Sequence, residues 1–183
     1  MPMRLLLIRH GATACSAAQR YCGHHDPPLI ALGRAQAAKL APRLAAAGVA
    51  AIYASDRRRA IQTAAIALPA LPVVTDAAWR EIDLGPWDGC THEEIAARWP
   101  AELAAWSRDR FHNPIPGGES GVQLLARARA ALDRIVAAHA GGAVAVVAHA
   151  GPIAALRCHL AGRPMPDYAW MLPELGEIVD LAL

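Results

Sequence analysis

Two apolar segments, far apart in the sequence, end in the same way, and this repeat constrains the fold most strongly. Residues 3–8 form a mostly apolar run that stops at Arg9-His10-Gly11, and residues 143–148 form an uninterrupted one that stops at His149-Ala150-Gly151. A short apolar run without polar alternation is typical of a strand buried on both faces of a parallel sheet. Because the carboxyl ends of parallel strands share one edge of a sheet, we expect His10 and His149 to lie there together.

The rest of the chain alternates between helix and strand patterns. Strands are expected over residues 49–54, 72–75 and 177–183, and helices over 33–47, 58–68, 92–99, 101–108, 121–140 and 151–160. This alternation predicts a three-layer α/β/α fold with a mostly parallel central sheet and helices on both faces. Two of the helices have a candidate core face. The predicted core residues are Ala35, Ala38, Leu40 and Leu44 in the helix 33–47, and Leu124, Leu125, Ala128, Leu132, Ile135 and Val136 in the helix 121–140.

Length and charge narrow the function classes. With 183 residues the chain is expected to fold as a single domain. The 18 Lys and Arg residues are balanced by 16 Asp and Glu residues, for a net charge of +2, which argues against a nucleic-acid partner. There is no apolar run of eighteen residues, so no membrane partner is expected.

The cysteines and the first residues point to a cytoplasmic protein. Cys15, Cys22, Cys90 and Cys158 are widely spread and contain no C-x-x-C pair. Reduced thiols are the simplest interpretation of such spacing. Residues 1–8 lead directly into Arg9-His10 without the small-residue cleavage site of a signal peptide, so secretion is not expected.

A third predicted strand, residues 49–54, also runs into polar residues, Ser55-Asp56-Arg57-Arg58-Arg59. Two imidazoles and several guanidiniums at one edge suit a phosphoryl group, because arginine presents a planar fork that matches phosphate oxygens. A neutral imidazole can also attack phosphorus and leave again, which divides hydrolysis into two easier steps. A lone histidine more often fills or caps its strand end, but the repeat of histidine closely followed by glycine favours a site.

Seven segments, in order along the chain, carry a family resemblance. Residues 7–13, Leu-Ile-Arg-His-Gly-Ala-Thr, resemble the R-H-G-x-T signature of the histidine phosphatase superfamily, the phosphoglycerate-mutase-like proteins. The other segments that resemble family motifs are residues 20–29, 33–37, 55–64, 80–89, 116–120 and 147–151. Each segment is a modest signal, but their common order makes chance agreement very improbable.

The resemblance implies a role for each matched position. His10 would be the nucleophile that carries the phosphoryl group, and Glu81 would protonate the leaving oxygen and then activate water. Gly11 would leave room for the phosphate, and the N-terminal N–H of Gly151 would add a donor. The residues expected to bind the phosphoryl oxygens are Arg9, Ser16, Arg59 and His149. The family needs no metal or other cofactor, so none is expected.

The sequence also departs from the family pattern and leaves some positions open. Ala12 replaces a frequent glutamate, Ser16 a common asparagine and Asp56 a common proline. Serine can still donate a hydrogen bond to phosphate, with a shorter reach. Three residues have two readings each, either a solvated side chain or a contact to the substrate: Arg57, Arg110 and His112.

The resemblance also suggests which kind of histidine phosphatase to expect. Residues 85–119 would form a small cap over the carboxyl ends of the strands, and this compact cap favours a metal-independent phosphomonoester hydrolase of the histidine acid type over a mutase. The substrate would be a small phosphorylated metabolite. Residues 80–89 and the Pro-Gly-Gly-Glu-Ser loop look like those of α-ribazole phosphatases, so α-ribazole 5'-phosphate of cobalamin biosynthesis is one candidate. A mutase-type phosphotransferase and a non-catalytic phospholigand-binding or phospho-relay module are the alternatives. The oligomeric state is not predicted.

Overall fold

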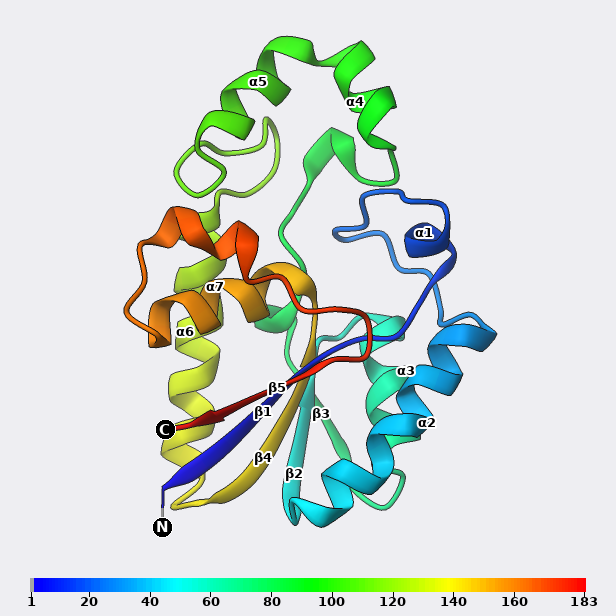
Figure 1. Ribbon diagram of the computed structural model, residues 1–183, viewed down its shortest axis with the longest axis vertical. Coiled ribbons are helices and arrows are strands. Elements are labelled where there is room, and N and C mark those ends of the chain that lie inside the picture. Colours follow the sequence, from blue (N-terminus) through cyan, green and yellow to red (C-terminus); the bar gives the residue numbers. More distant parts are fainter. Residues whose placement is uncertain (1) are drawn as a thin grey trace.

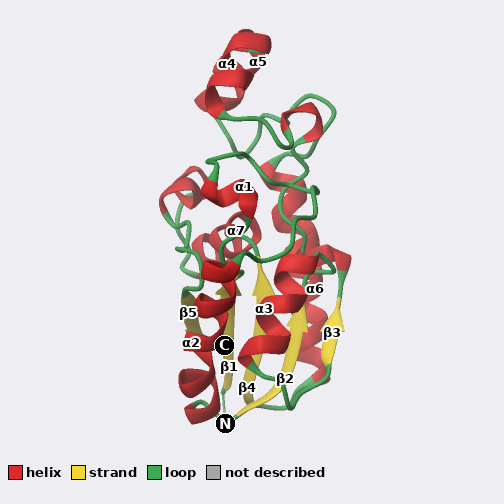
Figure 2. Ribbon diagram, turned by 90° about the vertical axis from the view of Figure 1, so that its right-hand side faces the viewer, coloured by secondary structure: helices red, strands yellow, loops and turns green. Residues whose placement is uncertain are grey.

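A computed structural model describes residues 2–183 and contains one five-stranded sheet with the order β3-β2-β4-β1-β5. The strands are β1 (Met3–Arg9), β2 (Val49–Ala54), β3 (Val73–Thr75), β4 (Gly142–Ala148) and β5 (Ile178–Ala182). β1 to β4 run parallel to their neighbours, and β5 is antiparallel to β1 at one edge. The predicted α/β fold with a mostly parallel sheet is therefore confirmed (Figures 1 and 2).

Helices cover both faces of this sheet. α2 (Ala31–Ala46) and α3 (Arg58–Ala67) cover one face, and α6 (Gly121–Ala138) and α7 (Ala150–Leu160) cover the other. The other α-helices, α1 (Ala14–Ala17), α4 (His92–Arg98) and α5 (Pro100–Arg108), lie beyond the carboxyl ends of the strands (Figure 1). Side chains of β1 alternate between two cores. Leu6 and Ile8 pack with residues of α2 and α3, and Leu5 and Leu7 pack with residues of α6 and α7. All four side chains are fully buried, as expected for a strand between two helical layers.

Every predicted helix and strand lies within two residues of its observed bounds. Four short helices were not predicted from the sequence: α1 and the 3₁₀ helices η1 (Ala77–Trp79), η2 (Gly85–Trp87) and η3 (Met165–Trp170). Helices of three to six residues are too short to show an apolar period. α1 is instead stabilised by a capping box between Thr13 and Ser16.

Three of the predicted core positions are wrong. Ala35 and Ala38 are exposed, whereas Gly33 and Ala37 of α2 are buried with Leu40 and Leu44. The observed spacing of four, three and four residues forms one straight stripe along the helix. Alanine is so frequent in this chain that it does not mark that stripe. Val136 of α6 also lies outside the buried stripe of its helix. It follows the last buried residue, Ile135, by one position and is 44% exposed.

Residues 85–119, which contain η2, α4 and α5, stand beyond the carboxyl ends of the parallel strands (Figure 1). Their apolar side chains continue the core between the sheet, α6 and α7: the rings of Trp87 and Trp106 meet edge to face at 5.5 Å, and Ile95 is fully buried. Within residues 2–183, no helix is both long and apolar enough to cross a membrane.

Candidate active site

The structure brings His10, Arg59 and His149 together at the carboxyl ends of β1, β2 and β4. His10 follows β1, His149 follows β4, and Arg59 belongs to the first turn of α3 after β2. The Arg59 Nε–H donates to His10 Nε2 and to His149 Nδ1, both at 3.2 Å. The two imidazole centroids are 5.0 Å apart. Parallel strands therefore deliver all three side chains to one point of the sheet edge.

The contacts of His10 define its protonation state. Its Nδ1 lies 2.8 Å from the carbonyl oxygen of Gly11, which can only accept a hydrogen bond, so we assign the proton to Nδ1. The lone pair then lies on Nε2, where it accepts the hydrogen bond from Arg59. Burial, together with the positive charge of Arg59, lowers the pKa of His10 to about 3. The imidazole is therefore neutral near pH 7, with Nε2 available as a nucleophile.

His149 has the opposite tautomer. Its Nδ1 accepts from Arg59, so the proton of the neutral ring lies on Nε2. Burial first, and then the charge of Arg59, hold the pKa of His149 well below its usual value. Nε2 is buried and finds no hydrogen-bond partner among the described residues. An unpaired buried donor is uncommon in proteins, and a phosphoryl oxygen would satisfy this one.

The two arginines are held by backbone carbonyl groups. Arg59 is fully buried, and its terminal nitrogens donate to the carbonyl oxygens of His25 at 2.6 Å and Gly23 at 2.8 Å. Arg9 donates through Nη1 to the carbonyl oxygen of Pro173 at 2.7 Å, and its Nε has no partner among the described residues. Burial lowers the pKa of Arg9. Both guanidiniums are thus fixed in place, and the cavity described below borders Arg9.

Glu81 is held at this edge by two backbone N–H groups. The Gly151 N–H lies 3.1 Å from each carboxylate oxygen, and the Ile82 N–H donates to Oε1 at 2.8 Å. The Gly151 N–H, expected to serve a phosphate, is therefore engaged by Glu81 in this structure. A Cβ atom on Gly151 would lie 2.2 Å from Glu81 Oε1, which explains the glycine at that position.

Ser16 borders the cavity, but its hydroxyl group is used in the cap of α1. It donates to the carbonyl oxygen of Thr13 at 2.9 Å and accepts from the Thr13 N–H at 2.9 Å. A serine hydroxyl has a single proton to donate. Ser16 would have to break its bond to Thr13 to donate to a phosphate, so its predicted role requires a rearrangement of α1.

The reason expected for Gly11 is wrong. A Cβ atom at Gly11 would lie 2.4 Å from the carbonyl oxygen of Gly33, inside the start of α2. A Cβ atom at Gly33 would in turn lie 2.1 Å from the carbonyl oxygen of Ala12. These two glycines allow the loop after β1 and α2 to approach each other closely. Packing of the backbone, and not room for phosphate, accounts for Gly11.

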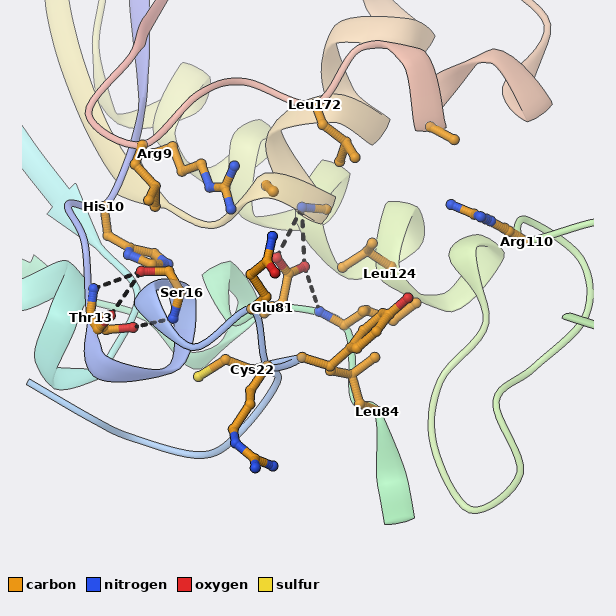
Figure 3. Close-up of a pocket in the computed structure, with 18 of the residues that line it drawn as sticks. Arg9, His10, Thr13, Ser16, Cys22, Glu81, Leu84, Arg110, Leu124 and Leu172 are labelled. Carbon is orange, nitrogen blue, oxygen red and sulfur yellow. Dashed lines mark hydrogen bonds between the residues drawn. The ribbon is translucent and has the colours of Figure 1, made fainter. Parts of the chain in front are cut away.

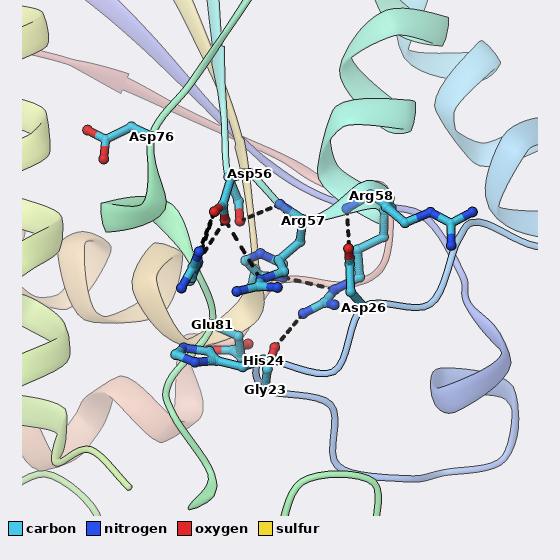
Figure 4. A network of polar contacts seen from close by, with 12 residues as sticks. Gly23, His24, Asp26, Asp56, Arg57, Arg58, Asp76 and Glu81 are labelled. Atoms are coloured by element: carbon cyan, nitrogen blue, oxygen red, sulfur yellow. Dashed lines mark hydrogen bonds and ion pairs between the residues drawn. The ribbon is translucent and has the colours of Figure 1, made fainter.

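Arg57, Arg110 and His112 were each predicted to be either solvated or in contact with the substrate, and one of the three borders the cavity. Arg110 does so, with its guanidinium carbon 4.7 Å from the centroid of the Trp106 ring. The side chain of His112 is 61% exposed and lies 2.7 Å from Asp109. Arg57 does not line the cavity and is 3.7 Å from Asp56 (Figure 4).

Asp56 replaces the proline common in the family, and its carboxylate has a specific partner. Arg80 Nε donates to Asp56 Oδ1 at 2.8 Å, and the Arg80 guanidinium makes a second bond to Oδ2 (Figure 4). The hydrogen bond from Arg80 lowers the pKa of Asp56. This ion pair ties the end of β2 to the residue just before Glu81.

A cavity of about 550 Å³ opens at this edge of the sheet (Figure 3). Arg9 and His10 lie on one side of the view and Arg110 on the opposite side, with Glu81 between them, and all four residues line the cavity. The wall also includes residues that were not predicted from the sequence to belong to the site, among them Tyr21, Cys22, Leu84, Leu124, Tyr168, Leu172 and Glu174. Several of them lie in loops with no periodic pattern, and only their position in the fold reveals them.

Cys22 lies in the wall but is not a competing nucleophile. Burial raises the pKa of its thiol to about 12, so the thiolate is scarce near neutral pH. All four cysteines are free thiols. Within residues 2–183 there is no group of three or more His, Cys, Asp or Glu side chains arranged to hold a metal ion.

A comparison with protein-family models gives one match over nearly the whole chain. The model of the histidine phosphatase superfamily (branch 1) matches residues 5–181. The match includes every residue of the site described above.

Individual proteins agree with this match. The chain is 42% identical over 155 residues to the bifunctional protein Rv2228c of Mycobacterium tuberculosis, covering 83% of this chain but only 42% of that protein. It is 39% identical over 184 residues to glucosyl-3-phosphoglycerate phosphatase of the same species, covering 94% and 80% of the two chains. The crystal structure of a putative α-ribazole-5'-P phosphatase from Escherichia coli has a TM-score of 0.91 at 27% identity, covering 98% and 90%.

Proposed function

The chain belongs to the histidine phosphatase superfamily, and on this premise we propose that it hydrolyses a phosphomonoester through a phosphohistidine on His10. The observation that carries the proposal is the neutral His10 imidazole, whose Nε2 lone pair faces Arg59. A nucleophile with a lowered pKa is neutral without the help of an added base. The names of several relatives also describe phosphatases.

The reaction would proceed in two steps. In the first, His10 Nε2 attacks phosphorus, the bond from phosphorus to the ester oxygen breaks, and Glu81 gives its proton to that oxygen. In the second, Glu81 takes a proton from water, the hydroxide attacks phosphorus, and the bond to Nε2 breaks. Arg9, Arg59 and the Nε2–H of His149 would bind the phosphoryl oxygens and stabilise their charge in both steps. The two arginines would thus supply the positive charge that a metal supplies in other phosphatases, the neutral His149 would add a hydrogen-bond donor, and neither step uses a metal.

Hydrolysis is favoured over the two alternatives by the surroundings of His10. A mutase must keep water away while the phosphoryl group returns to a second hydroxyl of the substrate, whereas the cavity here is open to solvent along the exposed side chain of Arg110. A binding module has no need of a carboxylic acid beside the nucleophile. Glu81 borders the same cavity as His10 and therefore favours an enzyme.

For the substrate we favour a small phosphorylated metabolite with a second anionic group. Arg110 offers a second cation across the cavity from Arg9 (Figure 3). Glucosyl-3-phosphoglycerate, named in the relative at 39% identity, contains a carboxylate that fits this position. α-Ribazole 5'-phosphate has none, but it stays the second candidate because a structural neighbour is named for it at 27% identity.

We further propose that the chain is a single histidine phosphatase domain in which residues 85–119 act as the cap. Trp106 and Arg110 of this segment border the cavity, so the segment contributes directly to the substrate site. Substrates of different shape would then be distinguished by these residues.

The test is to trap the intermediate. The enzyme is mixed with substrate for milliseconds and quenched in alkali, because phosphohistidine is labile in acid, and the modified residue is located by mass spectrometry. Phosphate on His10 is expected, with turnover unchanged in excess chelator. Phosphate on serine, aspartate or Cys22, or activity that needs a divalent ion, would overturn the mechanism. Turnover of glucosyl-3-phosphoglycerate, α-ribazole 5'-phosphate and 3-phosphoglycerate then ranks the candidate substrates.

A further inference from the structure

We propose that Arg127 and Glu119 are positioning residues that hold the segment carrying Glu81, so that its carboxyl group meets the leaving oxygen of the substrate. This inference rests on the proposed role of Glu81 as the general acid. Neither residue borders the large cavity that contains His10 and Glu81. We call the pair, with its contacts, the Arg127–Glu119 clamp.

Arg127 uses every donor of its guanidinium group in this clamp. The Nε–H group and one Nη2–H group donate hydrogen bonds to the two carboxylate oxygens of Glu119, each at 2.8 Å. Nη1 donates to the carbonyl oxygens of Ala78 at 2.8 Å and Arg80 at 2.7 Å, and Nη2 donates to that of Glu81 itself at 2.9 Å. A guanidinium has five N–H groups, and all five have partners here.

Glu119, in the Pro-Gly-Gly-Glu-Ser loop, holds the same segment from its other end. Its backbone N–H donates to the carbonyl oxygen of Asp83 at 2.9 Å, and its Oε2 accepts from the Asp83 N–H at 3.3 Å. Arg127 binds at and before Glu81, and Glu119 binds two residues after it. The segment is thus fixed on both sides of the acid, by side chains that are 23% and 14% exposed.

Glu81 needs such support because it lies in neither a helix nor a strand. Residues 80–84 connect η1 to η2 and belong to no helix or strand. The clamp connects them to α6, an 18-residue helix that also packs against α7, where Gly151 holds the Glu81 carboxylate. Two helices packed against each other therefore set the contacts of the acid, α6 that of its backbone and α7 that of its carboxylate. An error of about 1 Å in such a position is enough to slow a reaction strongly.

The test uses single-turnover release of the leaving group with enzyme in excess, which isolates the first step. The substrates are p-nitrophenyl phosphate, whose leaving group needs little protonation, and glycerol 3-phosphate, whose alkoxide needs a proton. The variants are Arg127→Lys, which has three donors in place of five, and Glu119→Gln, which keeps size and removes the charge. Arg134→Lys, on the same helix in an exposed ion pair with Asp76, is the matched control.

Glu81→Gln should slow the alkyl ester by ~100-fold and the nitrophenyl ester far less, as expected for loss of a general acid. Arg127→Lys and Glu119→Gln should show the same selectivity, at ~10-fold or more on the alkyl ester. Neither should add to the loss when combined with Glu81→Gln, because each acts through that residue. Arg134→Lys should change neither ester, and circular dichroism should show all variants folded.

The outcomes separate the two proposals. Equal losses on both esters in the Arg127 and Glu119 variants, or full additivity with Glu81→Gln, would overturn the clamp and leave the function of Glu81 intact. Equal losses on both esters in Glu81→Gln itself would remove the acid role, and the clamp would fall with it. If Arg127→Lys does not fold, the isosteric Glu119→Gln decides the question alone.

Discussion

The carboxyl-end edge of the sheet and the segment 85–119 face the same cavity but are built differently. At the edge, His10, Arg59 and His149 are at most 7% exposed and are bonded to one another and to backbone groups. In the segment, Trp106 is buried, but Arg110 extends over its ring into solvent-accessible space. Reaction chemistry needs groups fixed to a fraction of an ångström, and substrate choice needs a surface that can change without disturbing them.

The largest effect should come from the buried edge. His10→Ala removes the proposed nucleophile and should lower kcat by three orders of magnitude or more, since loss of a covalent nucleophile leaves only binding and electrostatic terms. Steady-state hydrolysis and circular dichroism measure activity and folding separately. His139→Ala is the control, because it removes a partly buried imidazole that hydrogen bonds Tyr53 at the end of α6 away from the cavity. Comparable activity in both variants would contradict the division between the two regions.

A smaller and selective effect should come from the segment. Arg110→Ala should raise KM by about tenfold for 3-phosphoglycerate and change little for glycerol 3-phosphate, which has the same phosphate but no carboxylate. kcat should change less than KM, because Arg110 is remote from the reacting atoms. Arg108→Ala, an exposed arginine of α5 that does not border the cavity, is the matched control. An equal rise in KM for the two esters would show that Arg110 does not bind a second anionic group of the substrate.

The sequence predicted the buried edge far better than the cavity wall, and the reason is physical. His10 and His149 follow apolar runs that are long enough to be recognised as buried strands, and parallel pairing then decides where both side chains lie. Arg59 lies in the first turn of α3, the helix that follows β2, so the topology brings the arginine-rich segment to this edge, and the family resemblance singled out Arg59 within it. Glu81 was singled out only through the family resemblance, because no periodicity marks residues 80–84.

The wall residues could not be found in this way. Tyr168, Leu172 and Glu174 lie in η3 and the loop after it, and they border the cavity only because the chain folds back before β5. The reason for Gly11 was wrong on similar grounds. Its neighbour across space is Gly33, 22 positions along the chain, and a close approach between two backbones leaves no local pattern in the sequence.

As the pH falls, the free energy of unfolding should decrease first because of the histidines at the buried edge, and not because of groups in the segment 85–119. The pKa of His10 is about 3 in the folded chain and near 6.5 in the unfolded chain, and that of His149 is also lowered. Between these values the unfolded chain binds protons that the folded chain does not, so stability rises with pH and is lost as pH falls below about 6.5. Each histidine contributes at most ~1.4 kcal/mol per pH unit.

The window from pH 6.5 to 5 isolates the histidines, because carboxylates whose pKa is lowered by ion pairs, such as Asp56 and Asp180, titrate only below it. Thermal melts across this window should show a Tm that falls steadily with pH. In the double variant His10→Gln/His149→Gln no imidazole remains to be charged on unfolding at these positions, so most of that slope should disappear, and each single variant should lose about half. If the slope of Tm against pH is unchanged in the double variant, the buried edge is not the acid-sensitive region of the molecule. The two neutral histidines beside Arg59 would then not be the source of its rigidity.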